Sequence, residues 1–420
     1  MDEALHQIEA VVGLTGPFGV GCTTAGKHLR DHRDYELIRL SDVVRREWES
    51  REKGQGPSRL DLQRLGDELR QEHGNHVLAE RALEHAVISW GEKDTQEHKV
   101  VIDGIRNTAE IVWLRDQFGS SFTLLAVIAP QSDRWDRIEN VYTDVELDKT
   151  HFLADDRRDR NEEVPWGQQV ELCIDLADVI VYNGADRILP EFKAKVVEFA
   201  ELVSGENVRH PTQEEILMNM AYSSRHSSKC AKRHVGAIIV GVDGHAIGVG
   251  YNENPLGTNP CIEEPKYGNR CYRDIVRNRH FRTLAADGAK CPACGEALPE
   301  IEGPPWNCPK CLELGEKTNL EDYFFPDRAM TWCTAIHAEV WAIFAAGGRA
   351  KDATMYTTTF PCFQCAGKII QTGISHVYFT EAYSDVAGAE RLDLAEVTYS
   401  QFEGVRSSNF ERIFASIQPV

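Results

Sequence analysis

Three side chains suited to binding a metal ion occur at the starts of two predicted helices. His337 opens His337-Ala338-Glu339, and two cysteines lie in Pro361-Cys362-Phe363-Gln364-Cys365. One imidazole and two thiolates give zinc three protein ligands and leave its fourth tetrahedral position open for water, as a catalytic zinc requires. The positive end of a helix dipole favours both thiolates, and we expect Pro361 to occupy the first helical position. The pattern therefore predicts a catalytic zinc held by His337, Cys362 and Cys365.

Glu339 is the predicted general acid and base of this site. It follows His337 by two residues, so its carboxylate points to another part of the helix surface and is free to act on a substrate. We expect it to take a proton from the attacking water and to deliver protons to a ring nitrogen and a departing amine. The alternative interpretation makes His337 a core histidine and the two cysteines small buried side chains. The order of the three residues and their places at helix starts favour zinc.

Four further cysteines form two C-x-x-C pairs. Cys291 and Cys294 are separated from Cys308 and Cys311 by 13 residues. Four thiolates complete a tetrahedron and leave no open position, so the pattern predicts a structural zinc of ribbon type. The spacing is slightly shorter than usual, and a redox pair or unliganded thiols are the alternatives. Two more cysteines are either additional metal ligands or small buried side chains, namely Cys261 and Cys271.

A glycine-rich loop near the N-terminus has the form of a phosphate-binding loop in which cysteine replaces lysine. It follows a predicted strand and opens a predicted helix, which is the context that G-x-x-x-x-G-K-[ST] requires. Backbone N–H groups can still hold phosphates there, and Thr23 can still bind Mg²⁺. Because Cys22 stands where the lysine belongs, we expect nucleotide binding without kinase turnover; the alternative is an inert module that supports assembly. The candidate phosphate-loop residues are Gly16, Gly19, Gly21, Thr23 and Thr24.

The elements around this loop predict a first α/β domain over residues 1–203. Short β-branched runs alternate with helical patterns, which is typical of βαβ units and a mostly parallel sheet. Breaker residues then predict a linker over residues 204–211. The predicted strands are Ile8–Leu14, Val100–Ile102, Phe122–Ile128 and Val179–Val181, and the predicted helices are Thr23–Asp31, Asp61–Leu69, Ala109–Phe118 and Ile188–Leu202.

A second domain is predicted over residues 212–420, and it carries both cysteine patterns. A helix leads into a hairpin, and a long irregular stretch from Asn252 to about Asp327 follows, with the cysteine-rich insertion at about residues 261–325. Alternating helices and strands complete the domain. The predicted helices are Glu214–Ser223, Ile336–Ala346 and Pro361–Thr372, and the predicted strands are Val235–Val240, Ala246–Tyr251, Thr354–Thr359 and Val377–Thr380.

The composition excludes several classes of protein. The 420 residues carry 46 Lys and Arg against 66 Asp and Glu, a net charge of −20, which argues against a broad nucleic-acid surface. No apolar run approaches the roughly 20 residues that span a bilayer, and Met1-Asp2-Glu3 lacks the start of a signal peptide. We therefore expect a cytoplasmic protein without a membrane partner, whose 12 cysteines stay reduced and serve metals in preference to disulfides.

Several short segments of the second domain match the pattern of one family. They are Ser228-Lys229-Cys230, Val235-Gly236-Ala237, Gly250-Tyr251-Asn252, His337-Ala338-Glu339 and Pro361 to Cys365. The last two form the H-x-E and P-C-x-x-C signature of zinc nucleobase deaminases. With these segments the domain resembles the deoxycytidylate deaminases. The resemblance implies substrate contacts by Ser228, by Asn252 to the sugar or base, and by Lys232 near the phosphate. The alternative for the basic residues Arg225, Lys229, Lys232 and Arg233 is an exposed, solvated face.

The first domain resembles P-loop nucleotide kinases, because Asp103 follows the strand Val100–Ile102 where those enzymes have an acidic strand end. We predict two α/β domains: a P-loop kinase-like parallel sheet, and a cytidine-deaminase-like α/β/α sandwich with a mixed sheet and an inserted zinc ribbon.

The pairing of the two domains resembles the bacterial anti-phage dCTP deaminases over nearly the whole chain. The implied reaction converts dCTP and dCMP to dUTP and dUMP plus ammonia, and it depletes the deoxycytidine nucleotides available to a phage. The resemblance also implies a homo-oligomer, commonly a hexamer, and a small inhibitory RNA as partner. The sequence does not distinguish dCTP from dCMP.

Three other functions stay open. A housekeeping dCMP deaminase that supplies dUMP for thymidylate synthesis leaves the first domain unexplained. An editing deaminase acting on RNA or single-stranded DNA needs a basic channel with stacking aromatics, which the net charge opposes. A bifunctional nucleotide kinase with a regulatory zinc domain conflicts with the missing loop lysine and with the intact Glu339.

Overall fold

The computed structural model divides the chain into two compact units. The first contains residues up to Ile216 together with residues from Phe402 onward, and the second runs from Leu217 to Gln401. The residues described are 8–51, 56–90, 98–138, 152, 156, 165–298, 307–313, 320–324, 332–381, 386–406 and 409–414. Among the helices in these ranges, none is both long enough and apolar enough to cross a membrane.

The first unit is built on a six-stranded sheet that is parallel except at one edge. Every residue of its strand β4 is buried, as expected for a β-branched run in a parallel sheet covered on both faces. All four predicted strands form, and β2 and β11 are added to them. The strands are β1 (Ile8–Thr15), β2 (Tyr35–Arg39), β3 (His98–Ile105), β4 (Phe122–Ile128), β5 (Val179–Tyr182) and β11 (Gly404–Val405), in the order β11-β5-β4-β1-β3-β2.

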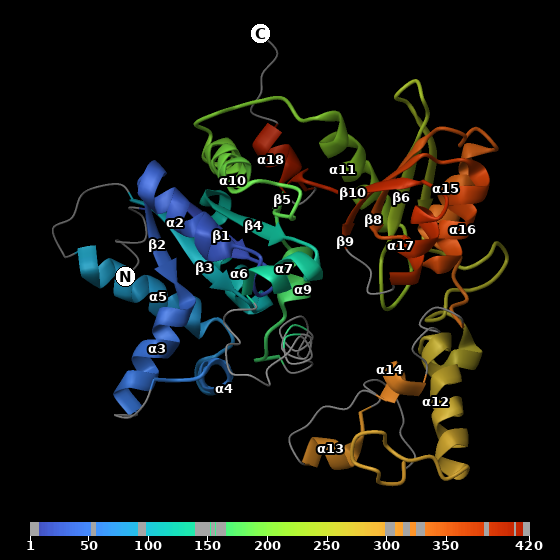
Figure 1. Cartoon of the computed structure of the whole chain (residues 1–420), viewed down its shortest axis with the longest axis horizontal. Helices are drawn as coiled ribbons and strands as arrows, with labels where there is room; N and C mark the ends of the chain where they lie inside the picture. Colours follow the sequence, from blue (N-terminus) through green and yellow to red (C-terminus); the bar gives the residue numbers. More distant parts are fainter. Residues whose placement is uncertain are drawn as a thin grey trace. The chain divides into compact units, whose positions relative to one another are not determined.

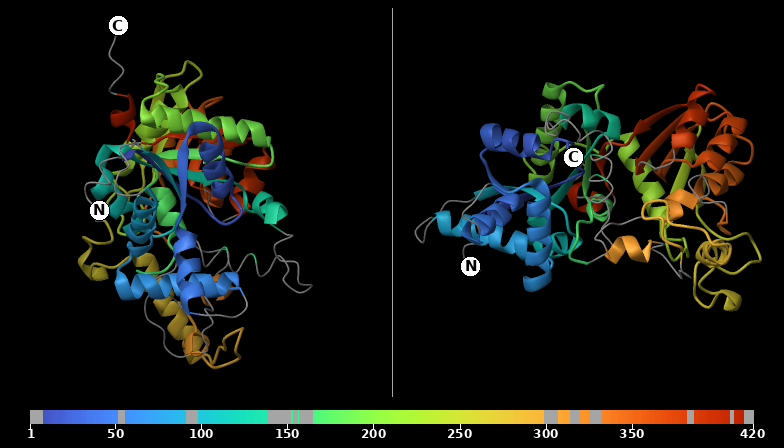
Figure 2. Two further views of the ribbon diagram at one scale, coloured as in Figure 1. Left: turned by 90° about the vertical axis from the view of Figure 1, so that its left-hand side faces the viewer. Right: turned by 60° about the horizontal axis from the view of Figure 1, so that its bottom comes forward.

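Helices cover both faces of this sheet (Figures 1 and 2). Helix α2 packs on α10, whereas α6 packs on β4 and contacts α5 and α9. Leu29 of α2 and Phe192 of α10 join Val127 of β4 in one buried core. The helices are α2 (Cys22–Arg33), α3 (Leu40–Arg51), α4 (Arg59–His73), α5 (Val77–Trp90), α6 (Thr108–Phe118), α7 (Gln131–Ile138), α9 (Val170–Asp175), α10 (Leu189–Ser204) and α18 (Phe410–Phe414).

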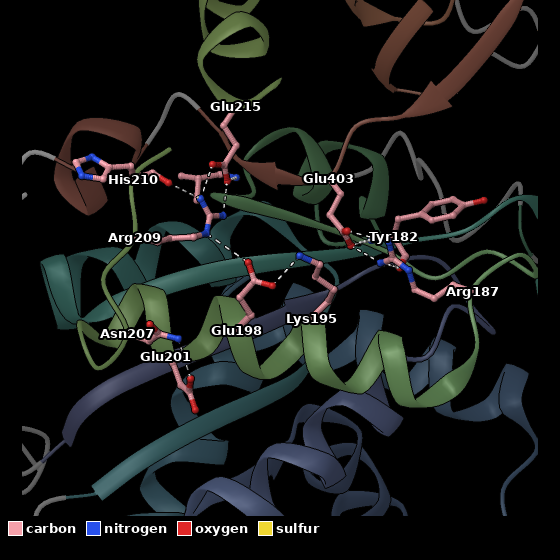
Figure 3. Close-up of polar contacts among 11 residues, drawn as sticks. Tyr182, Arg187, Lys195, Glu198, Glu201, Asn207, Arg209, His210, Glu215 and Glu403 are labelled. Carbon is pink, nitrogen blue, oxygen red and sulfur yellow. Dashed lines mark hydrogen bonds and ion pairs between the residues drawn. The ribbon is translucent and has the colours of Figure 1, made fainter. Parts of the chain in front are cut away.

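The chain returns to the first unit at its C-terminal end, in contrast to the expected extension of the second domain to residue 420. Strand β11 pairs antiparallel with β5, with Gly404 opposite Ile180. Glu403 accepts hydrogen bonds from the backbone N–H of Tyr182 at 2.9 Å and from both terminal nitrogens of Arg187 at 2.5 and 2.9 Å (Figure 3). Residues from 402 onward therefore belong to the first unit, because their strand completes its sheet.

A second set of contacts ties this return to the linker. Glu215 is 1% exposed and accepts hydrogen bonds from both terminal nitrogens of Arg209 at 2.7 and 2.8 Å. The same carboxylate accepts the backbone N–H groups of Thr212 at 2.8 Å and Val405 at 2.9 Å. Arg209 also lies 3.3 Å from Glu198 of α10 (Figure 3). Glu215 thus holds the linker and the returning strand in one network.

The second unit is built on a five-stranded mixed sheet. Strand β6 is antiparallel to both β7 and β8, whereas β8, β9 and β10 run parallel. The predicted hairpin forms as β6–β7, and the mixed sheet agrees with the predicted fold class. The strands are β6 (Gly236–Val240), β7 (Ala246–Tyr251), β8 (Thr354–Thr359), β9 (His376–Glu381) and β10 (Thr398–Gln401), in the order β10-β9-β8-β6-β7.

The insertion of the second unit begins and ends at an antiparallel bridge between Glu253 and Ile336. The stretch expected to be irregular contains the 15-residue helix α12, which is difficult to predict because its apolar residues do not gather in one stripe. Figure 1 shows α12, α13 and α14 grouped together. The helices of this unit are α11 (Gln213–Arg225), whose first residues belong to the first unit, α12 (Tyr272–Ala286), α13 (Pro309–Glu313), α14 (Leu320–Phe324), α15 (Ala338–Ala346), α16 (Phe363–Thr372) and α17 (Val386–Asp393).

Two glycines of β7 set how closely α15 approaches the sheet. A Cβ added at Gly250 would lie 2.1 Å from the carbonyl oxygen of Ala338, and one at Gly248 would lie 2.2 Å from that of Ala342. No side chain fits at either position, so α15 packs directly on the backbone of β7. This packing fixes the helix that follows His337 and carries Glu339.

Candidate active site

The structure brings the three predicted ligands of the catalytic zinc together. Nδ1 of His337 lies 3.2 Å from Sγ of Cys365 and 3.5 Å from Sγ of Cys362, and the three donor atoms all lie within 4.8 Å of one another. Nitrogen and sulfur ligands on a tetrahedron around zinc are about 3.5 Å apart at ordinary bond lengths. The donor set and its spacing therefore fit a zinc ion.

Two helix starts position these ligands, with one difference from the prediction. His337 directly precedes α15 and Cys362 directly precedes α16, each with an extended backbone. Because α16 begins at Phe363, Pro361 lies outside the helix and does not occupy its first position as predicted. The unpaired backbone N–H groups at both helix starts still favour thiolates there.

Hydrogen bonds among the three donor side chains shift their pKa values. A hydrogen bond from Cys365 lowers the pKa of Cys362 to about 4, and the same contact raises the pKa of Cys365 well above its usual value. Burial opposes a charge on His337, but hydrogen bonds with Cys333 and Cys362 outweigh burial and raise the pKa of His337 to about 10. The hydrogen bonds of the cluster thus favour the thiolate form of Cys362, which is the form that binds zinc.

Glu339 lies in the first turn of α15 and is 4% exposed. Burial raises the pKa of its carboxyl group, and the nearby His337 opposes this effect. A carboxyl group with a raised pKa can accept and release a proton closer to neutral pH, as a general acid and base requires. The structure thus places the Glu339 carboxyl group near the donor atoms, and it is not one of them.

The four ribbon cysteines form the second group of donor atoms. Sγ of Cys291 lies 3.7 Å from that of Cys311, Sγ of Cys294 lies 3.6 Å from that of Cys308, and all four lie within 4.8 Å of one another. Four sulfurs around one zinc are about 3.8 Å apart at ordinary bond lengths. Burial opposes ionisation of Cys291, but backbone N–H groups outweigh it and lower its pKa to about 7. The group fits a closed, structural zinc, and none of the 12 cysteines forms a disulfide.

A pocket lies beside the His337 cluster. Three of its lining residues, Cys333 to Ala335, precede Ile336 and His337 in the chain, and Asn252 to Asn254 line it after strand β7. Sγ of Cys261 lies 3.1 Å from Oγ1 of Thr334 in this lining. Four cysteines outside the two donor groups line the same pocket, namely Cys230, Cys261, Cys271 and Cys333.

Two of the predicted substrate contacts bind the backbone. Oγ of Ser228 donates to the carbonyl oxygen of Asn252 at 2.7 Å and accepts the backbone N–H of Cys230 at 3.3 Å. The Asn252 side chain donates to the carbonyl oxygen of Arg233 at 2.8 Å and accepts the backbone N–H of Val235 at 2.7 Å. Ser228 thus holds the end of β7, and Asn252 both lines the pocket and fixes the loop before β6.

The basic residues before β6 form ion pairs with carboxylates, whereas Lys232 was expected near the phosphate of the substrate. Lys232 pairs with Asp274 of α12 at 2.5 Å, and Arg233 pairs with Glu381 at 2.5 Å. Lys229 lines the pocket, at whose edge it pairs with Glu263 at 3.1 Å. The second cation among the described lining residues is Arg273. Sequence reasoning missed it because no pattern in the insertion points from α12 to this pocket.

The glycine-rich loop of the first unit has the backbone that its glycines permit. Gly19 and Gly21 have φ angles of 80° and 110°, in the left-handed region, and Gly21 directly precedes α2. A Cβ added at Gly16 would lie 2.3 Å from the carbonyl oxygen of Val127. All three glycines are therefore required by the path of the loop.

Thr23 and Asp103 meet beside this loop. Oγ1 of Thr23 donates to Oδ2 of Asp103 at 2.7 Å, so the hydroxyl proposed for Mg²⁺ lies at the acidic end of β3. Thr24 follows in the first turn of α2. Burial raises the pKa of the Cys22 thiol, so this side chain is neutral and does not replace the charge of the missing lysine.

Two buried side chains from distant elements hold the loop, and no sequence pattern points to them. Arg134 donates to the carbonyl oxygen of Phe18 at 3.0 Å and forms a buried ion pair with Asp156. Asn183 donates to the carbonyl oxygen of Val20 at 2.7 Å. Both contacts fix the loop through its carbonyl oxygens.

Comparison with known proteins assigns each unit a set of relatives. The model of the cytidine and deoxycytidylate deaminase zinc-binding region matches residues 211–381. A UPF0200 protein of Halobacterium salinarum is 33% identical over 173 residues, which are 41% of this chain and 84% of that protein. The deoxycytidylate deaminase of Saccharomyces cerevisiae is 28% identical over 195 residues, or 46% of this chain, and the match spans 45% of that enzyme's own length.

Solved structures resemble each half of the chain. The dCMP deaminase of cyanophage S-TIM5, solved with dCMP and dUMP, aligns over 46% of this chain and 99% of its own, with 20% identity and a TM-score of 0.28. The shikimate kinase of Acinetobacter baumannii, solved with shikimate, aligns over 50% of this chain and all of its own (100%), with 14% identity and a TM-score of 0.29.

Proposed function

This chain belongs to the UPF0200 family through its N-terminal unit and to the zinc-binding deaminases through its C-terminal unit, and we propose that it deaminates deoxycytidine nucleotides by hydrolysis. The observation that carries the proposal is the convergence of Nδ1 of His337 with the sulfurs of Cys362 and Cys365, near the buried carboxyl group of Glu339. Three donors with a neighbouring proton carrier are what hydrolytic removal of an exocyclic amine needs.

The residues of the site have separate roles in this reaction. His337, Cys362 and Cys365 hold the zinc, which when bound lowers the pKa of water and so supplies a nucleophile at neutral pH. Glu339 takes one proton from the attacking water and passes it to the ring nitrogen of the cytosine. It then takes the second proton from the new hydroxyl group on the ring carbon and gives it to the amino group, which leaves as ammonia. The four ribbon cysteines hold a second, structural zinc in the insertion.

We further propose that both dCTP and dCMP are substrates, giving dUTP and dUMP, and that the reaction depletes deoxycytidine nucleotides during phage infection. The resemblance of the paired domains to the bacterial anti-phage dCTP deaminases supports this proposal, and the yeast deoxycytidylate deaminase supports a deoxynucleotide substrate. The same resemblance is the basis for proposing a homo-oligomer and an inhibitory RNA.

A substrate panel tests the activity. The purified, zinc-loaded protein is expected to release ammonia from dCMP and dCTP and to leave CTP, cytidine and a cytosine-containing oligonucleotide largely unchanged. Ammonia release and the uracil products are measured at equal substrate concentrations, with a Glu339→Gln preparation as the control for contaminating deaminases. Faster turnover of cytidine or of the oligonucleotide would refute the proposal.

The first unit supports a second proposal, nucleotide binding without phosphoryl transfer. The path of the glycine loop and the hydrogen bond between Thr23 and Asp103 support binding of phosphates and Mg²⁺. The neutral Cys22 supports the lack of transfer, because the cation that bridges the β and γ phosphates is missing.

Thr23→Ala tests this binding. Losing one hydroxyl ligand is expected to weaken the binding of Mg²⁺-ATP about tenfold. The measurement is calorimetric titration of the full-length protein, with Thr372→Ala as the matched control, since Thr372 bonds only to carbonyls of its own helix among its recorded contacts. Equal affinity of the two variants would remove Thr23 from the nucleotide site.

A further inference from the structure

Helix α17 packs against the start of α16, the helix that directly follows Cys362 and carries Cys365 (Figure 1). A Cβ added at Gly388 of α17 would lie 2.5 Å from the carbonyl oxygen of Pro361 and 3.4 Å from the carbonyl carbon of Cys362. No side chain fits there, so the backbone of α17 lies directly on the backbone that carries Cys362. Leu392, which is fully buried in the core of this unit, holds α17 in place.

One side chain of α17, Arg391, contacts the first turn of α16. Its Nη1 donates to the carbonyl oxygen of Phe363 at 2.9 Å, and its guanidinium carbon lies 4.4 Å from the centre of the Phe363 ring. Phe363 is the first residue of α16 and lies between Cys362 and Cys365 in the chain. A charged donor on a carbonyl oxygen and a cation over an aromatic ring are both attractive. Arg391 therefore holds both the backbone and the side chain of Phe363.

Gly367 of α16 leaves the space in which the guanidinium group of Arg391 lies. A Cβ added at Gly367 would lie 2.5 Å from the guanidinium carbon and from Nη2, and 2.7 Å from Nη1. Gly367 lies inside a regular helix, where alanine is more favourable than glycine. The helix itself therefore does not require glycine at this position, whereas the contact of Arg391 with Phe363 does.

We propose that Arg391 is a positioning residue of the catalytic zinc site, which holds the first turn of α16 so that the sulfurs of Cys362 and Cys365 keep their places beside His337. The inference rests on the proposed function, because it takes these three residues to be the ligands of a catalytic zinc. Groups outside the ligand set orient the ligands, and losing such a group weakens metal binding. Arg391 does this through Phe363 and is not itself a donor to the metal.

Zinc affinity tests this role. In the full-length protein, Arg391→Ala is expected to weaken zinc binding at the three-ligand site by about tenfold, the effect of losing a partner outside the ligand set. Competition with a chelator gives the affinity, and a Cys365→Ser protein, which keeps the four ribbon cysteines, identifies the ion that belongs to the ribbon. Arg391→Lys should restore part of the affinity, because lysine keeps the charge but lacks the planar group that stacks on Phe363.

Two further measurements separate positioning from a general loss of stability. In cadmium NMR of the cadmium-loaded protein, sites with two and with four thiolate ligands resonate separately. Arg391→Ala should shift the two-thiolate resonance and leave the four-thiolate resonance in place. In the deamination assay it should lower kcat and change KM for dCMP by no more than about twofold, because Arg391 acts on the zinc ligands.

Gly367→Ala displaces the guanidinium group without removing it. The added Cβ meets the end of a flexible side chain, so Arg391 moves away from Phe363 while α16 keeps its fold. Gly367→Ala should therefore weaken zinc binding as Arg391→Ala does, without lowering the melting temperature, since alanine favours the helix. The double variant should bind zinc no more weakly than Arg391→Ala alone. Additive effects, or a Gly367→Ala protein with wild-type zinc affinity, would overturn the inference.

The matched control is Arg349→Ala. Arg349 also donates to carbonyl oxygens, those of Ala346 at 2.9 Å and Ile247 at 3.1 Å, but it lies beyond the end of α15 that is opposite to His337. Its loss should leave the zinc affinity unchanged. If Arg391→Ala keeps the wild-type zinc affinity and cadmium resonance, this inference is wrong while the proposed function stands. A wild-type protein that binds zinc only at the ribbon and releases no ammonia from dCMP would contradict both.

Discussion

Glu339→Gln is expected to lower the rate of dCMP deamination by about 10³-fold or more, within the range that general acid–base catalysis contributes. The substitution keeps the size of the side chain and removes its ability to carry a proton. Glu339 is not one of the donor atoms that surround the zinc position, so the zinc content of the protein should not change. Single-turnover rates give the loss of activity, and elemental analysis gives the zinc content.

The matched control for this variant is Glu390→Gln, an exposed carboxylate on α17. It should retain activity to within about twofold. A Glu339→Gln protein that loses zinc together with activity would make Glu339 a ligand, contrary to the assignment. A variant that keeps most of its activity would place the proton carrier elsewhere.

Glu215→Ala is expected to destabilise the first unit by about 3 kcal/mol, because it removes the buried partner of a charged group. The carboxylate of Glu215 accepts hydrogen bonds from two nitrogens of Arg209 (Figure 3). It also accepts the backbone N–H groups of Thr212 and Val405. Its loss leaves these donors without their acceptor in a site that water does not reach easily. The linker and the returning strand β11 should loosen together.

Two measurements check this prediction. Denaturant unfolding gives the change in free energy, and hydrogen exchange at Val405 reports the release of β11. Glu198→Gln is the matched control, since Glu198 pairs with the same Arg209 but is 33% exposed and should cost less than about 1 kcal/mol. If Glu215→Ala costs no more than Glu198→Gln, or if Val405 stays protected, the proposed network does not hold the strand.

The donor groups could be predicted from the sequence because zinc chemistry restricts residue type and local spacing together. Two cysteines three residues apart lie close together on one turn or zinc knuckle, and this proximity does not depend on the tertiary fold. His337, Cys362 and Cys365 therefore came together as predicted, and so did the four ribbon cysteines. The strands of both sheets were predictable for a similar reason, because a short continuous apolar run such as Phe122–Ile128 indicates a buried strand from local sequence alone.

The pocket beside the His337 cluster could not be predicted in the same way. The resemblance to the deoxycytidylate deaminases implied that Lys232 lies near the phosphate, and in the structure Lys232 pairs with Asp274. Arg273 lies in the insertion and lines the pocket from the first turn of α12. Sequence proximity does not report such contacts, because they depend on how a helix without an apolar stripe packs.

The sequence by itself determined which side chains can bind zinc and that the chain contains two α/β units. These properties depend on residue type and on spacing within a few residues. The tertiary structure alone decided that residues from 402 onward complete the first sheet, that Glu215 holds them, and that Arg273 lines the pocket. Each of these contacts joins residues from separate elements, and pairing over such separations is decided by burial, strand register and charge satisfaction in the folded chain.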